Sequence, residues 1–231
     1  MNMKNQDNWT SDFSLPTACR LVRPEGECPA KTLLVALHGM GQNAELMTRA
    51  VQPLVAADRA ILIPDGPLPF EKTVSRGRRK IGRAWYLYTG DQVSFLESAR
   101  LSGAWLMAQI ERAKSELGDD NIPVQLLGYS QGGYLAAILT FDNPGRFDRL
   151  VSCCSRMKTE ILADEGPEPI PVLVIHGAKD EALPIERARE SADDLTKRGW
   201  PVDFRAFPDA GHKMELEQWQ AVDAWLRTPQ D

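Results

Sequence analysis

The stretch VQLLGYSQGGYLAAIL, residues 124–139, decides how this chain is organised, because an apolar run leads directly into Gly-x-Ser-x-Gly and then into a helical pattern. A strand that reverses at once into a helix strains the backbone of the central Ser130 and projects its hydroxyl out of the turn. Only small residues fit two positions on either side of it, at Gly128 and Gly132. The stretch predicts a nucleophile elbow; the alternative is a glycine-rich turn with a capping serine.

Two later segments supply an acid and a histidine in the chain order that such an elbow requires. Residues 171–177 form an apolar run that predicts a buried parallel strand, and Asp180 lies in the loop just beyond it. Residues 202–207 alternate like an edge strand and lead to His212. Because chemistry in an open parallel sheet gathers at the carboxyl ends of the strands, Ser130, Asp180 and His212 are expected to converge.

Each of these three residues has a chemical reason to be there. A serine hydroxyl is a poor nucleophile at neutral pH and needs a base within hydrogen-bond reach, and the base needs a carboxylate that fixes its tautomer. We expect Ser130 to be the nucleophile, His212 the base and Asp180 the carboxylate. Asp209 is the rival carboxylate, although it lies in the same loop as His212.

Acyl transfer also requires hydrogen-bond donors for the oxyanion that develops on the substrate. The backbone N–H of Gln131, directly after the elbow serine, is the first expected donor. An apolar run at 32–37 predicts a strand, and the glycines on either side of Met40 let the following loop turn inward. We expect the Met40 backbone N–H to be the second donor. The alternative is that this loop is an ordinary strand-to-helix turn.

Strand-like and helical segments alternate along the chain, which predicts an α/β fold with a mostly parallel sheet and helices on both faces. The strand-like runs lie near 19–23, 32–37, 60–64, 124–128, 148–154, 171–177 and 202–207. The helical patterns lie near 43–57, 94–117, 131–142, 185–198 and 215–226. We expect one domain over 1–231, with about 1–17 loosely ordered, and no large cap domain because the connection 156–170 is short.

These motifs together resemble the alpha/beta-hydrolase superfamily and, within it, the phospholipase/carboxylesterase family that includes the acyl-protein thioesterases. The matching stretches are LHGMG at 37–41, IPDGP at 63–67, RAWY at 83–86, GYSQGG at 128–133, HGAKD at 176–180 with LP at 183–184, and GH at 211–212. The resemblance implies a serine esterase that acts on carboxylic or thioester acyl groups through an acyl-enzyme, without a metal or an organic cofactor. A peptidase or lactonase on the same scaffold, and a catalytically silent binding module, are the alternatives.

The pocket is predicted less sharply than the catalytic residues. His38 and His176 each end an apolar strand directly before a glycine, which favours a structural or pocket-lining role. The residues expected to line the substrate pocket are His38, Trp85, Arg156 and Leu183. Arg156 belongs to a stretch, 153–156, that departs from the small or apolar residues of the resembled family, and its charge counts against a long fatty acyl substrate.

A basic connection precedes Trp85 and is longer than most loops in compact domains. Its basic residues are Lys72, Arg76, Arg78, Arg79, Lys80 and Arg83. Two interpretations stay open for this 71–83 loop. It is a solvated, mobile surface, or it overhangs the pocket and attracts anionic substrates.

The net charge, the apolar stretches and the cysteines indicate which kinds of partner and which location to expect. The net charge of −5 and the pI near 5.4 give no sign of nucleic acid as a partner, so a small acyl ester or thioester is expected. No apolar stretch approaches the roughly 18 residues of a membrane span, and the first residues lack the apolar core of a signal peptide. Four cysteines without Cys-x-x-Cys spacing suit a reducing compartment, so we expect a cytoplasmic location. Oligomeric state has no signal in the sequence.

Overall fold

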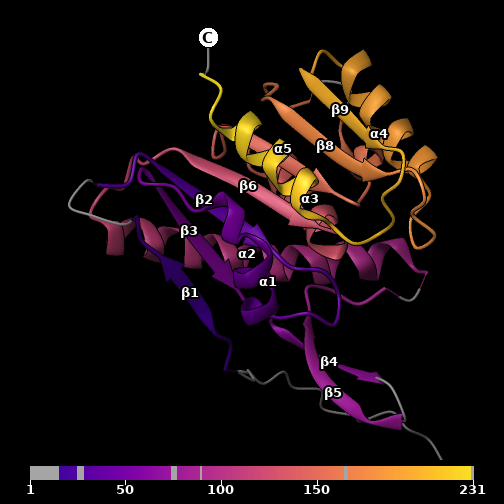
Figure 1. Cartoon of the computed structure of the whole chain (residues 1–231), viewed down its shortest axis with the longest axis horizontal. Helices are drawn as coiled ribbons and strands as arrows, with labels where there is room; N and C mark the ends of the chain where they lie inside the picture. The colour runs from indigo at the N-terminus through magenta and orange to yellow at the C-terminus, as the bar shows by residue number, and fades with distance from the viewer. Residues whose placement is uncertain (1–15, 25–28, 74–76, 89, 164–165, 230–231) are drawn as a thin grey trace, which may run out of the picture.

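The computed structural model describes residues 16–24, 29–73, 77–88, 90–163 and 166–229. Within them, a seven-stranded sheet has the order β1-β3-β2-β6-β7-β8-β9 (Figure 1). Its strands are β1 (Cys19–Val22), β2 (Thr32–Leu37), β3 (Arg59–Pro64), β6 (Val124–Tyr129), β7 (Arg149–Cys153), β8 (Val172–Gly177) and β9 (Val202–Phe207). β1 runs antiparallel to β3, and all other neighbours are parallel. The predicted α/β fold is confirmed, with β9 at the edge as expected.

Helices cover both faces of this sheet, as predicted (Figure 1). They are α1 (Ala44–Ala50), α2 (Gln92–Leu117), α3 (Gln131–Asp142), α4 (Ile185–Lys197) and α5 (Leu216–Leu226). Successive side chains of a strand point to opposite faces, so Leu33 and Val35 of β2 pack with α2, α3 and α4, whereas Leu34 packs with α1 and α5. No helix in the described ranges is long and apolar enough to cross a membrane.

The predicted helix over 43–57 is wrong in length. α1 ends at Ala50, and a 3-10 turn, η1 (Gln52–Leu54), follows. Pro53 explains the break, because proline has no N–H for the helical ladder and its ring clashes with the preceding turn. Asn43 starts α1 by accepting a hydrogen bond on its side chain from the Leu46 N–H.

The basic connection is a hairpin rather than a loop. β4 (Leu68–Thr73) pairs antiparallel with β5 (Arg79–Ala84), from Leu68 opposite Ala84 to Thr73 opposite Arg79. Sequence patterning missed these strands because only the end near Leu68 and Ala84 is partly buried and the rest is solvent-exposed, so no apolar alternation runs along their whole length. Arg76 lies outside the described residues, as does almost all of the N-terminal segment predicted to be loosely ordered.

The strand ends set the position of the candidate site. Leu37 at the end of β2 is level with Gly128 near the end of β6, and Tyr129 is level with Cys153 at the end of β7. The loops after these strands and after β8 and β9 therefore emerge at one edge of the sheet. Between β7 and β8, the described residues hold only one regular element, the 3-10 turn η3 (Thr159–Ile161), and no large cap.

Candidate active site

Ser130 occupies the sharp turn between β6 and α3 with a backbone conformation of φ 53° and ψ −118°. This positive φ is strained for a residue with a Cβ atom. A Cβ on Gly128 would lie 2.2 Å from the Gly132 carbonyl oxygen, and a Cβ on Gly132 would lie 2.4 Å from the Leu37 carbonyl oxygen. Both flanking glycines are thus required by close backbone approach, and the Ser130 N–H is fixed by donating to the Cys153 carbonyl at 2.9 Å.

Ser130, His212 and Asp180 lie in a continuous hydrogen-bonded chain. His212 Nε2 is 3.0 Å from Ser130 Oγ, and His212 Nδ1 is 2.8 Å from Asp180 Oδ2. A carboxylate can only accept, so the ring carries its proton on Nδ1 and leaves Nε2 free to accept from the serine hydroxyl. That is the tautomer a general base needs. The carbonyl of His212 accepts from the Tyr129 hydroxyl at 2.9 Å, which holds the His212 loop against the elbow.

The Asp180 carboxylate is fully buried and fixed at both oxygens. Its Oδ1 accepts from the backbone N–H groups of Ala182 and Leu183, each at 2.9 Å, while Oδ2 faces His212. Asp209 lies elsewhere: it is exposed and accepts from Lys179 Nζ at 2.7 Å. Of the two carboxylates left open by the sequence, only Asp180 contacts His212 in the described structure.

Two backbone N–H groups beside Ser130 have no acceptor in the part of the chain that the structure describes. They belong to Met40, in the loop after β2, and to Gln131, the first residue of α3. Both residues line the same cavity as Ser130. The helix that begins at Gln131 adds the positive end of its dipole at this point. The pair has the features of an oxyanion hole.

The loop that carries Met40 is held by the hairpin. The Gly41 N–H donates to the Arg83 carbonyl at 2.8 Å, and the Arg83 N–H donates to the Gln42 carbonyl at 2.7 Å. A Cβ on Gly82 would lie 2.2 Å from the Gly41 carbonyl oxygen, so strand β5 packs directly against this loop. Sequence reasoning missed this function of the hairpin, because cross-strand contacts between distant segments leave no local pattern.

Trp85 lies under the site. It is fully buried, its Nε1–H donates to the His38 carbonyl at 2.7 Å, and its backbone N–H donates to Gln131 Oε1 at 2.9 Å. The Gln131 side chain donates a hydrogen bond from Nε2 to the Tyr86 carbonyl at 3.1 Å. Trp85 therefore links the segments that carry the N–H groups of Met40 and Gln131. The prediction that Trp85 lines the pocket is wrong, because it is not among the cavity-lining residues.

The other two histidines are buried and are not hydrogen-bonded to the serine. His38 donates from Nδ1 to the Gly39 carbonyl at 2.8 Å and accepts on Nε2 from the Gly66 N–H at 2.9 Å. Burial lowers the pKa of His38 from 6.5 to about 4, so it is neutral and structural at neutral pH. His176 donates to the Gly177 carbonyl at 3.1 Å, and burial lowers its pKa as well.

A cavity of about 650 Å³ opens at Ser130. Apolar side chains such as Phe95 and polar side chains such as Gln92 both line it. The lining residues are Met40, Tyr86, Tyr88, Gln92, Phe95, Ser130, Gln131, Tyr134, Arg156, Lys158, Glu160 and Ala182.

Of the four predicted pocket residues, only Arg156 lines this cavity. His38 and Trp85 are fully buried beneath the cavity. Their hydrogen bonds support the Met40 loop instead of facing a substrate. Leu183 packs against the core and contributes its backbone N–H to Asp180. The residues that the sequence did not single out, Gln92 and Lys158 among them, come from α2 and from the connection after β7. Polar residues on a helix surface give no sign of which cavity they face.

Cys154, Asp180 and His212 place possible metal-ligand atoms within 4.8 Å of one another. Asp180 and His212 already use these atoms in their mutual hydrogen bond. Burial, followed by the charge of Asp180, raises the pKa of the Cys154 thiol to about 12, which disfavours the thiolate that a metal would need. The chemistry of this trio fits a hydrogen-bonded acid and base better than a metal site.

Residues 20–229 match the model of the phospholipase/carboxylesterase family. The chain belongs to this family. Among its curated relatives, acyl-protein thioesterase 1 of Gibberella zeae is 23% identical over 212 residues, which cover 84% of this chain and 88% of the relative. A probable carboxylesterase of Arabidopsis thaliana, named SOBER1-like, is 25% identical over 239 residues, which cover 94% of this chain and 84% of the relative.

Solved structures share the fold. The structure of esterase PE8 matches this one with a TM-score of 0.77 at 20% sequence identity. The match covers 92% of this chain and 99% of the PE8 chain. A carboxylesterase from Mesorhizobium loti has a TM-score of 0.72 at 24% identity, with 91% and 94% of the two chains covered. With the family match, these findings make the chain a hydrolase of the carboxylesterase and thioesterase kind.

Proposed function

We propose that this hydrolase is a serine esterase that cleaves carboxylic ester or thioester bonds of small acyl substrates, with Ser130 as nucleophile, His212 as base and Asp180 as the orienting carboxylate. The observation that carries the proposal is the hydrogen-bonded chain from Ser130 Oγ through the His212 ring to Asp180, at 3.0 and 2.8 Å. Ser130 also lines a cavity together with Met40 and Gln131, whose backbone N–H groups have no acceptor among the described residues, and this supports the same conclusion.

The reaction follows from these positions. His212 Nε2 takes the hydroxyl proton as Ser130 Oγ bonds to the substrate carbonyl carbon, and the N–H groups of Met40 and Gln131 stabilise the oxyanion. Collapse of the resulting tetrahedral intermediate breaks the bond to the alcohol or thiol, which leaves with the proton from His212. Water then attacks the acyl-enzyme, His212 takes its proton and returns it to Ser130 Oγ, and the carboxylic acid departs.

Kinetics of Ser130→Ala test the proposal. The change should lower kcat for a short para-nitrophenyl ester by on the order of 10⁴–10⁶, because nothing else supplies the nucleophile. Ser94→Ala, on the exposed start of α2, is the matched control and should keep wild-type kcat. A folded Ser130→Ala protein with near-full activity would refute the proposal.

A substrate panel separates the alternatives. Acyl esters of graded chain length, thioesters, lactones and short peptides share the same tetrahedral chemistry, so their relative kcat/KM values distinguish an esterase from a peptidase or lactonase. A silent binding module would turn over none of them. The single domain over 1–231 and the cytoplasmic location remain predictions from the sequence.

A further inference from the structure

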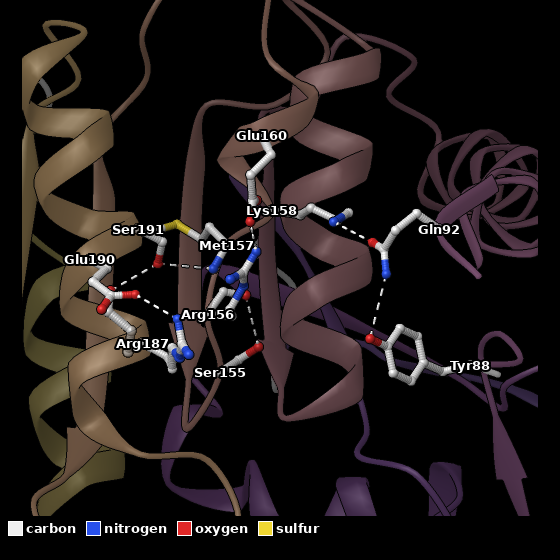
Figure 2. A network of polar contacts seen from close by, with 11 residues as sticks. Tyr88, Gln92, Ser155, Arg156, Met157, Lys158, Glu160, Arg187, Glu190 and Ser191 are labelled. Atoms are coloured by element: carbon white, nitrogen blue, oxygen red, sulfur yellow. Dashed lines mark hydrogen bonds and ion pairs between the residues drawn. The ribbon is translucent and has the colours of Figure 1, made fainter. Parts of the chain in front are cut away.

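The cavity is lined by two cations, Arg156 and Lys158, on one short segment after β7. Lys158 donates from Nζ to Gln92 Oε1 at 2.8 Å, and Gln92 Nε2 in turn donates to the Tyr88 hydroxyl at 3.5 Å. Arg156 lies beside this group and is paired with Glu160 (Figure 2). All five of these side chains line the cavity that opens at Ser130.

The two cations are not equivalent. Arg156 is neutralised by Glu160, and its guanidinium lies 6.0 Å from the centre of the Tyr134 ring. Burial opposes ionisation of Glu160, but backbone hydrogen bonding and the charges of Arg156 and Lys158 outweigh it and lower the Glu160 pKa, so one carboxylate faces two cations. Among the described residues, no carboxylate lies within 4.0 Å of Lys158 Nζ, which contacts a neutral amide. The cavity therefore holds one unbalanced positive charge.

The backbone that carries these cations is fixed to its surroundings. The Met157 N–H donates to Ser191 Oγ of α4 at 3.2 Å, and the Ser155 hydroxyl donates to the Arg156 carbonyl at 3.2 Å (Figure 2). Met157 itself is buried in the core. A positioned charge at the wall of a cavity stabilises a bound anion more than a free surface lysine does, because less side-chain and backbone order is lost on binding.

We propose that the cavity selects ester or thioester substrates that carry a carboxylate, and that Lys158, with Gln92 and Tyr88 beside it, binds that carboxylate while Ser130 attacks the acyl carbon. The inference rests on the proposed esterase function and adds the substrate class to it. One net positive charge matches a singly charged carboxylate, whereas a phosphate monoester would bring a second negative charge close to Glu160. The ammonium, amide and phenol groups offer the N–H and O–H donors that a carboxylate accepts.

The source of selectivity is local to the cavity. The chain as a whole has a net charge of −5 and repels anions at long range, so its overall field cannot produce a preference for them. The basic hairpin residues that the structure describes do not line the cavity, and Arg79 is already paired with Glu71. The attraction of anionic substrates that was predicted for the basic connection is therefore assigned to Lys158.

Matched pairs of substrates test the inference. Each pair joins the para-nitrophenyl monoester of a dicarboxylic acid, from adipic acid upward, to the neutral para-nitrophenyl ester of the monocarboxylic acid of equal length. The wild-type ratio of kcat/KM, charged over neutral, should exceed one for at least one pair. Lys158→Met should lower that ratio about tenfold, as expected for a part-buried charge contact, and Lys158→Arg should largely restore it. Lys80→Met, which removes the same charge from the exposed hairpin, should leave the ratio and the neutral activity unchanged.

The outcomes separate two kinds of failure. Turnover of neutral esters with a ratio at or below one for every pair would overturn the carboxylate inference and leave the esterase proposal standing. A ratio that Lys158→Met does not change, or that Lys80→Met lowers equally, would overturn it as well. A para-nitrophenyl ester with a phosphate at the chain end that outperforms its carboxylate partner would reject the carboxylate as the selected group. No turnover of any ester would remove both proposals together.

Discussion

Acid should destabilise this protein through His38, which supports the loop that carries Met40. The ring is fully buried, and its Nε2 accepts a hydrogen bond from the Gly66 N–H at 2.9 Å, a bond that protonation would destroy. Burial lowers the pKa of His38 from 6.5 to about 4 in the folded protein. The unfolded chain therefore binds the proton more tightly, so the stability that His38 contributes is complete above about pH 6.5 and falls as the pH drops toward about 4.

The size of the effect follows from the two pKa values. Each pKa unit corresponds to about 1.4 kcal/mol, so the free energy of unfolding should lose about 2.5 kcal/mol between about pH 7.5 and about pH 4.5 through this one group. Urea unfolding of the wild type and of His38→Gln at both pH values isolates it, because glutamine can donate to Gly39 and accept from Gly66 but cannot titrate. Contributions from carboxylates are common to both proteins and cancel. A stability difference between the two proteins that stays constant within about 0.5 kcal/mol would refute the reasoning.

Three further predictions concern the site. Ser130→Gly should be more stable than Ser130→Ala by about 1 kcal/mol in urea unfolding, because the strain that glycine relieves at the positive φ of 53° exceeds the extra entropy that glycine loses on folding. Gly82→Ala should lower kcat at least about tenfold, because its Cβ would lie 2.2 Å from the Gly41 carbonyl oxygen and displace the Met40 loop. Asp180→Asn should lower kcat by on the order of 10⁴, as the corresponding change does in serine proteases, whereas Asp209→Asn should change it less than about twofold.

A Ser130→Ala protein more stable than Ser130→Gly would show that the elbow is not strained. Wild-type kcat in Gly82→Ala would mean that the hairpin does not position the loop. Equal losses in Asp180→Asn and Asp209→Asn would require a different carboxylate partner for His212.

Much of the sheet could be predicted because its strands are buried on both faces and form near-continuous apolar runs, as in β2 and β8. The elbow was predictable for a similar reason: the glycines flanking Ser130 are imposed by backbone contact within a few residues of the chain. Local constraints of this kind leave a signature in the nearby sequence. Asp180 and His212 could then be predicted because each lies in the loop that follows a predicted strand.

Contacts between distant segments were not predictable. The hairpin β4–β5 is largely solvent-exposed beyond its base, and its contact with the Met40 loop joins residues far apart in the chain. Trp85 was predicted to line the pocket because it follows the long basic connection, yet its indole N–H donates to the buried His38 carbonyl. Lys158 gave no signal, since a lysine on a surface connection is ordinary until the fold places it at a cavity.

The most direct test of the central claim, that His212 activates Ser130, is covalent labelling with a fluorophosphonate followed by mass spectrometry of the digested protein. The hydrogen-bonded arrangement predicts one adduct per chain, on the peptide that contains Ser130, and a labelling rate that falls by several orders of magnitude in His212→Ala. Adduct on a different serine, or an unchanged rate in His212→Ala, would contradict it.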